Sequence, residues 1–160
     1  LRHGSARAIA LAPPAAREPL MRRAADALWA ALSPQGVSWI GFYVIAPDRA
    51  SLILGACRDA PACSPIALHG LCGRGWTERR AIVVRDVATL GANYIACEAR
   101  DRSELVVPLF EADGSCWGVL DADSREVASF SHGDAEELGD LMEHLGLSAP
   151  IRPRPPALEL

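Results

Sequence analysis

One turn between two apolar runs constrains the fold of this chain more than any other feature of its sequence. Residues 103–110 are rich in Val and Leu, residues 116–123 begin with Cys, Trp, Val and Leu around one Gly, and Asp113-Gly114 lies between the two runs. An Asp-Gly pair between apolar runs is a strong signal for a two-residue turn that joins antiparallel strands. Pro108 lies within the first run and indicates an edge position or a bulge there. The sequence therefore predicts an antiparallel hairpin in its second half.

The spacing of apolar residues predicts the other elements. Between Arg17 and Leu32 they recur at intervals typical of an amphipathic helix. Ser131 precedes a second apolar stripe, and Asp134 three positions later would complete a helix cap. β-Branched and aromatic residues bounded by Gly, Pro and Asp indicate strands. The remaining predicted elements are strands at 37–45, 52–56 and 81–84 and a helical turn near 74–79.

The order of these elements is helix, hairpin, loop-rich segment, hairpin and helix. This order favours an α+β fold in which an antiparallel sheet carries the N- and C-terminal helices on one face. The Gly- and Pro-rich residues 58–99 would cover the other face as loops, with a pocket beneath them. We expect a flexible segment at 1–16, one domain at 17–147 and a Pro-rich tail at 148–160.

Composition excludes several classes of protein. At 160 residues, half of them hydrophobic, the chain can bury one core but not two. Its net charge is −4, and Lys and Arg form no stripe with aromatic residues, so we expect no nucleic-acid partner. The longest apolar stretch, 39–46, is far shorter than the ~20 residues that span a bilayer, and 8–16 is too short for a signal peptide. We therefore expect a soluble, cytoplasmic protein with no membrane partner.

The five cysteines follow no structural pattern. Their number is odd and they form no C-x-x-C pair, which argues against a disulfide scaffold and a structural zinc site. In a reducing compartment such residues are either buried fillers or reactive thiols. No metal site and no phosphate-binding glycine loop is predicted, so we expect neither a metal nor an organic cofactor. The cysteines are Cys57, Cys63, Cys72, Cys97 and Cys116.

Two acidic residues at the end of the last predicted strand point the same way. Alternation along a strand puts Asp121 and Asp123 on one face, together with Trp117 and Val119. Adjacent like charges are unfavourable in a dry core, whereas a site that binds an ammonium group or shares a proton would use them. The alternative is a solvated strand end.

Two aromatic residues share a face of the first predicted strand. Trp39 and Tyr43 are four residues apart, and Gly41 between them would leave an open gap flanked by two aromatic walls. A thioether or the methyl group of a sulfoxide fits such a gap, because sulfur contacts with aromatic rings are favourable. Ordinary core packing is the alternative.

Short motifs along the chain occur in the order found in one enzyme family. They are Trp39-Ile-Gly-Phe-Tyr43, Pro61-Ala-Cys63, Leu71-Cys72-Gly73, Asp86-Val87, Tyr94-Ile-Ala-Cys97, Ser103-Glu-Leu-Val-Val-Pro108 and Gly118-Val-Leu-Asp121-Ala-Asp123-Ser124. With this set the chain resembles the free methionine-(R)-sulfoxide reductases, which are GAF-domain enzymes. The resemblance covers roughly residues 20–147. It implies a GAF fold with a sheet of about six antiparallel strands that encloses free, rather than peptide-bound, methionine sulfoxide.

The resemblance implies a role for three of the cysteines. Cys97 matches the family's nucleophile, Cys63 its main resolving cysteine and Cys72 a third cysteine on the neighbouring loop. A thiolate can attack the sulfoxide sulfur and retain the oxygen as a sulfenic acid, which a second thiol then converts to a disulfide. Cys57 and Cys116 fall on predicted strands and are interpreted as packing residues.

The resemblance also implies which residues hold the substrate. Trp39 and Tyr43 match the family's aromatic residues, while Glu104, Asp121 and Asp123 match its carboxylates. A protonated member of the acidic group could donate its proton to the sulfoxide oxygen.

The leading hypothesis is that the protein reduces free methionine-(R)-sulfoxide to methionine and that thioredoxin reduces the resulting disulfide. The resemblance also suggests a homodimer, with the N-terminal helix as a candidate contact. The alternative is a ligand-sensing GAF module that binds a small molecule without catalysis. A third hypothesis is a relative that reduces another sulfoxide or is inactive, because Gly55-Ala56-Cys57 and Tyr94 depart from the family pattern near the site.

Overall fold

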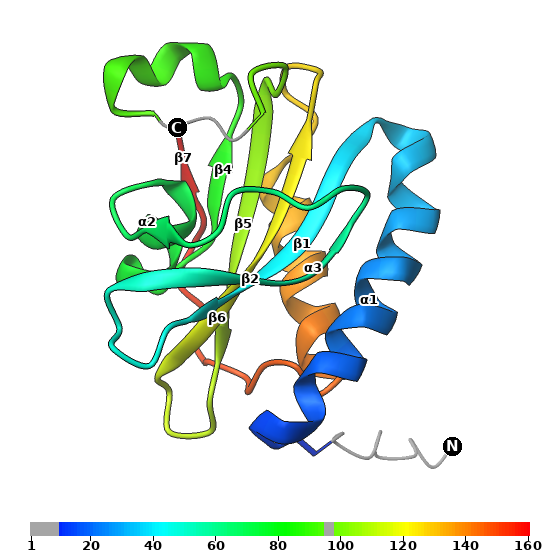
Figure 1. Ribbon diagram of the computed structural model, residues 1–160, viewed down its shortest axis with the longest axis vertical. Helices are drawn as coiled ribbons and strands as arrows, with labels where there is room; N and C mark the ends of the chain where they lie inside the picture. The colour runs from blue at the N-terminus through cyan, green and yellow to red at the C-terminus, as the bar shows by residue number, and fades with distance from the viewer. Residues whose placement is uncertain (1–9, 95–97) are drawn as a thin grey trace.

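Seven strands form one sheet in the computed structural model, which describes residues 10–94 and 98–160. Their order across the sheet is β3-β2-β1-β6-β5-β4-β7 (Figure 1). Neighbours are antiparallel except β4 and β7, which run parallel. The strands are β1 (Val37–Ile45), β2 (Ser51–Arg58), β3 (Ile66–Ala67), β4 (Ile82–Val84), β5 (Ser103–Phe110), β6 (Cys116–Ser124) and β7 (Leu158–Glu159).

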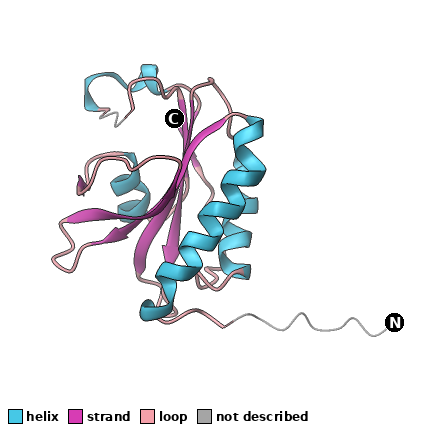
Figure 2. Cartoon of the chain, turned by 45° about the vertical axis from the view of Figure 1, so that its right-hand side comes forward, coloured by secondary structure: helices cyan, strands magenta, loops and turns pink. Residues whose placement is uncertain are grey.

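The helices divide between the two faces of this sheet. The long helices α1 and α3 cover one face, and α2 lies on the other with the loops (Figures 1 and 2). This arrangement confirms the predicted α+β fold with both terminal helices on one face. The helices are α1 (Arg17–Leu32), α2 (Leu71–Glu78) and α3 (His132–His144), with short 3-10 segments at η1 (Pro14–Ala16), η2 (Ser33–Gln35) and η3 (Val87–Asn93).

Local sequence signals explain where the long helices begin and end. α1 has the predicted bounds and continues into the 3-10 segment η2, which ends at Gly36, whose φ of +105° favours glycine. α3 begins with the predicted cap: Asp134 donates its backbone N–H to Ser131 Oγ, and Ser131 donates its own to Asp134 Oδ2 at 2.9 Å. The cap of α3 thus fixes the start of one of the two helices that cover the apolar face of the sheet.

The turn between β5 and β6 is wider than the predicted two-residue turn. Glu111 donates its backbone N–H to the Ser115 carbonyl at 2.8 Å, and Gly114 donates to the Glu111 carbonyl at 2.9 Å. A two-residue type I′ turn needs positive φ at both central residues. Gly114 reaches +84°, whereas Asp113 stays outside the positive region and accepts the Ser115 N–H with its carboxylate at 2.9 Å. The hairpin itself is confirmed.

A bulge puts Trp117 on the face opposite to the prediction. β5 and β6 pair Leu109 with Gly118 and Phe110 with Cys116, so Trp117 is skipped in the pairing. One extra residue in a strand reverses the alternation of side chains beyond it. The Trp117 indole therefore packs in the helix-side core and donates to the Leu147 carbonyl at 3.1 Å.

The residues after α3 extend the sheet. Leu158 and Glu159 pair with Ile82 and Val83 of β4, and Leu158 and Leu160 pack against the apolar cluster on the α2 side. The antiparallel part of the sheet thus comprises β1 to β6, in agreement with the six strands that the family resemblance implies, and β7 adds a seventh in parallel.

Candidate functional site

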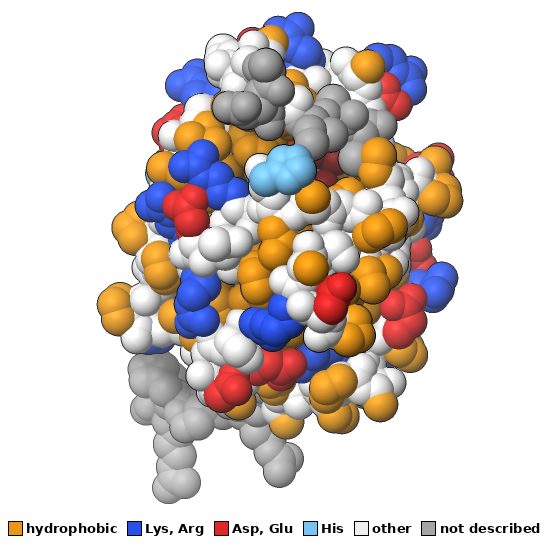
Figure 3. All heavy atoms as spheres, turned by 60° about the vertical axis from the view of Figure 1, so that its left-hand side comes forward, with side chains coloured by type: hydrophobic (Ala, Val, Ile, Leu, Met, Phe, Trp, Pro, Cys, Tyr) orange, Lys and Arg blue, Asp and Glu red, His pale blue; other side chains and the backbone are white. Residues whose placement is uncertain are grey.

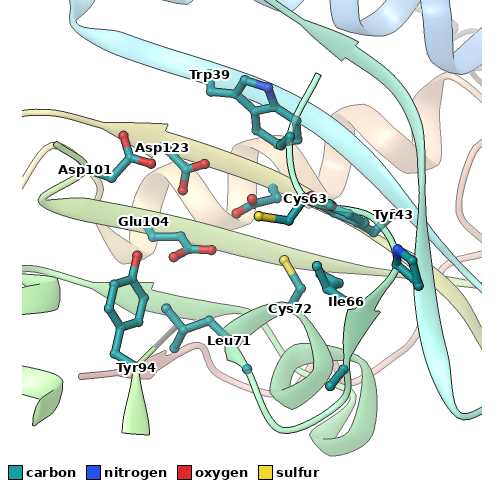
Figure 4. A pocket seen from close by; sticks show the side chains of 15 residues that line it. Trp39, Tyr43, Cys63, Ile66, Leu71, Cys72, Tyr94, Asp101, Glu104 and Asp123 are labelled. Atoms are coloured by element: carbon teal, nitrogen blue, oxygen red, sulfur yellow. The ribbon is translucent and has the colours of Figure 1, made fainter. Parts of the chain in front are cut away.

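A cavity of about 230 Å³ lies between the sheet and the loop-and-helix layer that contains β3 and α2. It opens on the face that carries no long helix, where Figure 3 shows Arg side chains mixed with apolar and acidic ones. The residues around it come from five strands or helices and from three loops (Figure 4). They are Trp39, Tyr43, Ala62, Cys63, Pro65, Ile66, Ala67, Gly70, Leu71, Cys72, Tyr94, Asp101, Glu104, Asp121 and Asp123.

Three of the lining carboxylates come from the central strands β5 and β6. The register pairs Glu104 with Asp123 and Val106 with Asp121, which places all three acidic side chains on the cavity face. The alternation predicted for Asp121 and Asp123 is confirmed. All three are almost fully buried, with exposures of 5 to 8%. They are therefore not a solvated strand end.

Burial and mutual repulsion change the acidity of this group. Desolvation, followed by the charge of Asp123, raises the pKa of Glu104 to about 8. Desolvation also raises the pKa of Asp121 and Asp123 well above their ordinary value, and the neighbouring carboxylates add to the effect. Asp121 Oδ1 accepts no hydrogen bond from the described residues. All three shifts disfavour the charged carboxylates, and a cation that enters the cavity would favour their ionisation.

Asp101 is a fourth carboxylate that the sequence analysis missed. It precedes β5, is 8% exposed, and accepts a hydrogen bond from Ser38 Oγ at 3.3 Å. Desolvation raises its pKa as well. Its sequence position, in the polar stretch between Glu98 and Ser103, resembles an ordinary loop charge. No local signal distinguishes it from the surface acids around it.

The aromatic pair forms one wall of the cavity. The ring centroids of Trp39 and Tyr43 are 6.1 Å apart, and both residues line the cavity. The expected open gap at Gly41 is not formed, because a Cβ there would lie 2.4 Å from Trp39 Cη2. Gly41 thus makes room for the indole ring itself. The indole donates to the Ala60 carbonyl at 2.7 Å and the Tyr43 hydroxyl to the Cys63 carbonyl at 2.8 Å, so the wall also anchors the loop after β2.

Tyr94 adds a hydrogen-bond donor to the acidic side of the cavity. Its ring points towards Glu104 (Figure 4). Desolvation, reinforced by the charge of Glu104, raises the pKa of Tyr94 above its ordinary value, so the phenol remains protonated.

Two of the cysteines that match the family's motifs line the cavity. Cys63 is exposed in the loop between β2 and β3, and its sulfur and that of Cys72 both point into the cavity (Figure 4). Cys72 does not lie on a loop as expected: it is 5% exposed in the first turn of α2. Gly73 permits this helix start, because a Cβ there would lie 2.1 Å from the Leu68 carbonyl oxygen. Cys97 lies outside the described residues.

The remaining two cysteines, Cys57 and Cys116, do not line the cavity. Cys57 is half-buried in β2 and Cys116 is buried in β6, and burial raises the pKa of both thiols, to about 11 for Cys116. Cys116 donates its S–H to the Gly118 carbonyl. Both lie in strands, as expected, although β2 reaches Cys57 only because it extends beyond the predicted 52–56.

Three side chains in the cavity wall form a set of possible metal ligands. One ligand atom each from Cys72, Glu104 and Asp121 lie within 4.8 Å of one another. Metal sites are recognisable in a sequence mainly when their ligands stand at short spacings, so this set was not predicted. These three are far apart in the chain, and only the packing of α2 on β5 and β6 brings them together.

Among residues 10–94 and 98–160, no helix combines the length and the apolar character that crossing a bilayer requires.

Comparison with known proteins places this fold and cavity in a family. The model of the family described as GAF domain matches residues 15–148. The free methionine-R-sulfoxide reductase of Saccharomyces cerevisiae is 33% identical over 132 residues, which cover 80% of this chain and 73% of the relative. The reductase of the same name from Escherichia coli is 33% identical over 110 residues, covering 68% of this chain and 64% of the relative.

A solved structure agrees with these relatives. The X-ray structure of free methionine-R-sulfoxide reductase from Neisseria meningitidis in complex with its substrate superposes with a TM-score of 0.72 at 38% identity, covering 79% of this chain and 73% of that one. The motifs, the fold and the relatives therefore agree, and the chain belongs to the GAF-domain family of free methionine-R-sulfoxide reductases.

Proposed function

We propose that this protein reduces free methionine-(R)-sulfoxide to methionine by thiol chemistry. The observation that carries the proposal is a cavity lined by two thiols, an aromatic pair and four carboxyl groups. A sulfoxide reductase needs a nucleophile for sulfur, a proton source for oxygen and a means of holding the amino acid. The named relatives support the choice of substrate.

The acidic cluster would bind the substrate's ammonium group. Glu104, Asp121 and Asp123 are buried with raised pKa values, and no Arg, Lys or His is found among the described residues that line the cavity. An entering ammonium group favours ionisation of these carboxyls, so binding gains a buried ion pair. Trp39 and Tyr43 would contact the sulfur and its methyl group.

Cys97 would be the nucleophile, on the strength of the motif Tyr94-Ile-Ala-Cys97. Its described neighbours support this assignment, because Tyr94 lines the cavity and Glu98 lines an adjoining one. The thiolate attacks the sulfoxide sulfur. The oxygen is transferred to the cysteine sulfur, which becomes a sulfenic acid, and methionine is released. A protonated carboxyl of the cluster supplies the proton that the oxygen requires.

Cys63 and Cys72 would resolve the sulfenic acid. The thiol of either attacks the sulfenic sulfur, a disulfide forms and the oxygen leaves as water. Thioredoxin then reduces this disulfide and is itself oxidised, so each turnover consumes two electrons from thioredoxin. Cys63 is the better candidate, because it is exposed in a loop whereas Cys72 is buried in α2.

The setting of the reaction is part of the same proposal. The protein would act in the cytoplasm, where thioredoxin keeps thiols reduced, and would need no other cofactor. We further propose that residues 17–147 form the GAF domain and that two chains associate through α1.

A coupled assay tests the reaction. The reduced protein is incubated with free methionine-(R)-sulfoxide, thioredoxin, thioredoxin reductase and NADPH. NADPH oxidation is expected with this epimer, but not with the (S) epimer or a peptide-bound sulfoxide. Cys97→Ser should abolish turnover, while Cys116→Ser, remote from the cavity, should retain it. If the reduced wild type shows no turnover, the proposal is wrong and a ligand-sensing role becomes the better hypothesis.

Single-turnover chemistry tests the resolving thiols. Cys63→Ser should form one equivalent of methionine and then stall, unless Cys72 takes over. The double variant Cys63→Ser/Cys72→Ser should form one equivalent of methionine and no more. Multiple turnovers by the double variant would rule out the resolving assignment.

A further inference from the structure

Three different elements bring a thiol and two carboxylates to one point of the cavity wall. Cys72 comes from α2, Glu104 from β5 and Asp121 from β6, and their ligand atoms lie within 4.8 Å of one another. All three residues are nearly completely buried, with exposures of 5, 6 and 5%. Together they could coordinate a single bound ion through one soft sulfur atom and two hard oxygen atoms.

The three groups are held in place by the backbone. Glu104 and Asp121 lie on the adjacent strands β5 and β6, where Asp121 pairs with Val106, two residues after Glu104. α2 packs closely on this ladder, because a Cβ on Gly75 would lie 2.7 Å from Val106 Cγ1. The site is therefore preorganised, which lowers the cost of ordering it around a ligand.

Asp121 supplies a second observation that points to a ligand. Its Oδ1 is buried and accepts no hydrogen bond from the described residues, although a buried carboxylate oxygen normally has a partner. The described residues that line the cavity include no Arg, Lys or His that could neutralise it. A cation that enters the cavity would supply a partner for this atom.

We propose that the reduced protein binds one Zn²⁺ ion through Cys72 Sγ, a carboxylate oxygen of Glu104 and Asp121 Oδ1, with the fourth coordination position open to the cavity. Zn²⁺ accepts sulfur and oxygen ligands in a tetrahedron, whereas Mg²⁺ and Ca²⁺ avoid thiolates. Tetrahedral zinc requires ligand atoms about 3.4–3.6 Å apart, so the three groups need to close by about 1 Å. The Cys72 thiol loses its proton to solvent as the S–Zn bond forms, and no electron is transferred.

Bound zinc would oppose the reductase reaction. It occupies two carboxylates and a thiol that the reaction would use, so it should compete with the substrate's ammonium group and withhold Cys72 from disulfide exchange. This consequence rests on the proposed function, whereas zinc binding does not. Zinc is expected to raise the apparent KM for the sulfoxide, and a chelator should reverse the effect.

Co²⁺ serves as a spectroscopic probe of the site. Titration of the reduced full chain with Co²⁺ should produce a near-ultraviolet thiolate-to-metal absorption band at one equivalent, and added Zn²⁺ should remove it. Cys72→Ser and Cys72→Ala should lose the band. Glu104→Gln and Asp121→Asn should each weaken binding by more than about tenfold.

Matched controls separate this site from other thiols and acids. Cys57→Ser and Glu137→Gln, the latter on the exposed side of α3, should retain both the band and the affinity, because neither residue belongs to the three-ligand set. Circular dichroism checks that every variant is folded. Absence of Zn²⁺ binding by the reduced wild type, or a band that persists in both Cys72 variants, overturns the proposal. Zinc binding by a protein without reductase activity would refute only the proposed function.

Discussion

The two faces of the central strands carry opposite chemistry, although they are built from alternate residues of the same segments. On β6, Leu120 and Ala122 enter the dry core under α1 and α3, while Asp121 and Asp123 enter the cavity. The exposures of all four are 8% or less, so burial does not separate the two faces. The difference is that the helix face buries apolar side chains against each other, whereas the cavity face buries acidic groups whose ionisation a bound cation would favour.

The largest effect should come from placing a charge on the helix face. Leu120→Asp buries an unpaired carboxylate in a core without a cavity and is expected to cost about 4–5 kcal/mol or more, enough to prevent cooperative folding. Urea unfolding followed by circular dichroism measures the loss. Leu120→Met should cost less than about 1.5 kcal/mol. Wild-type stability of Leu120→Asp would show that the two faces are equivalent.

The cavity face should make stability depend on pH. The folded pKa of Glu104, about 8, lies above the unfolded value of roughly 4.3, so the folded state binds more protons between these limits. The stabilisation that Glu104 contributes is complete below its unfolded pKa and is lost as pH rises through its folded pKa. From pH 5 to pH 8 the free energy of unfolding should fall by on the order of 3 kcal/mol. Glu104→Gln should flatten the curve, and an equally steep curve in that variant would contradict the assignment.

Removing one cavity charge should stabilise the protein and impair binding. Asp121→Asn eliminates a carboxyl whose pKa is raised by burial, and a gain of about 1–2 kcal/mol is expected at pH 8. Denaturant midpoints and sulfoxide affinity are measured on the same sample. Glu137→Gln, on the exposed side of α3, should change stability by less than about 0.5 kcal/mol. Lower stability in Asp121→Asn would mean that the carboxylate already has a favourable partner.

The smallest expected change in stability concerns the N-terminal cap of α3. Ser131→Ala removes the cap of α3 and should cost about 1 kcal/mol without a change in ligand affinity. Ser131→Asp restores an acceptor and should remain close to the wild type. A loss of affinity in Ser131→Ala would show that the helix layer communicates with the cavity.

Periodicity and caps predicted most of the fold. α1, β1 and β5 have the predicted bounds because their patterns span many residues. The predictions failed where the local conformation of a single residue decides the structure. A single bulge moved Trp117 to the other face, and local Asp113 bonding widened the hairpin turn. No periodic pattern contains either event.

The site was predictable where strand alternation or the family motif fixed it. Alternation gave Asp121 and Asp123, while the motif selected Glu104 and Cys63 for the cavity wall. The approach of α2 to β5 depends on close backbone contacts, so the proximity of Cys72 to the carboxylates is invisible in the sequence. The role of Cys97 stays a prediction.

The sheet ends in very short strands on both sides. β3 and β7 contain two residues each, so they leave few unpaired backbone groups for another chain to join. Residues 158–159 cover β4, whose Ile82, Val83 and Val84 are fully apolar and would otherwise form an open edge. The C-terminal strand thereby protects the molecule against edge-to-edge aggregation.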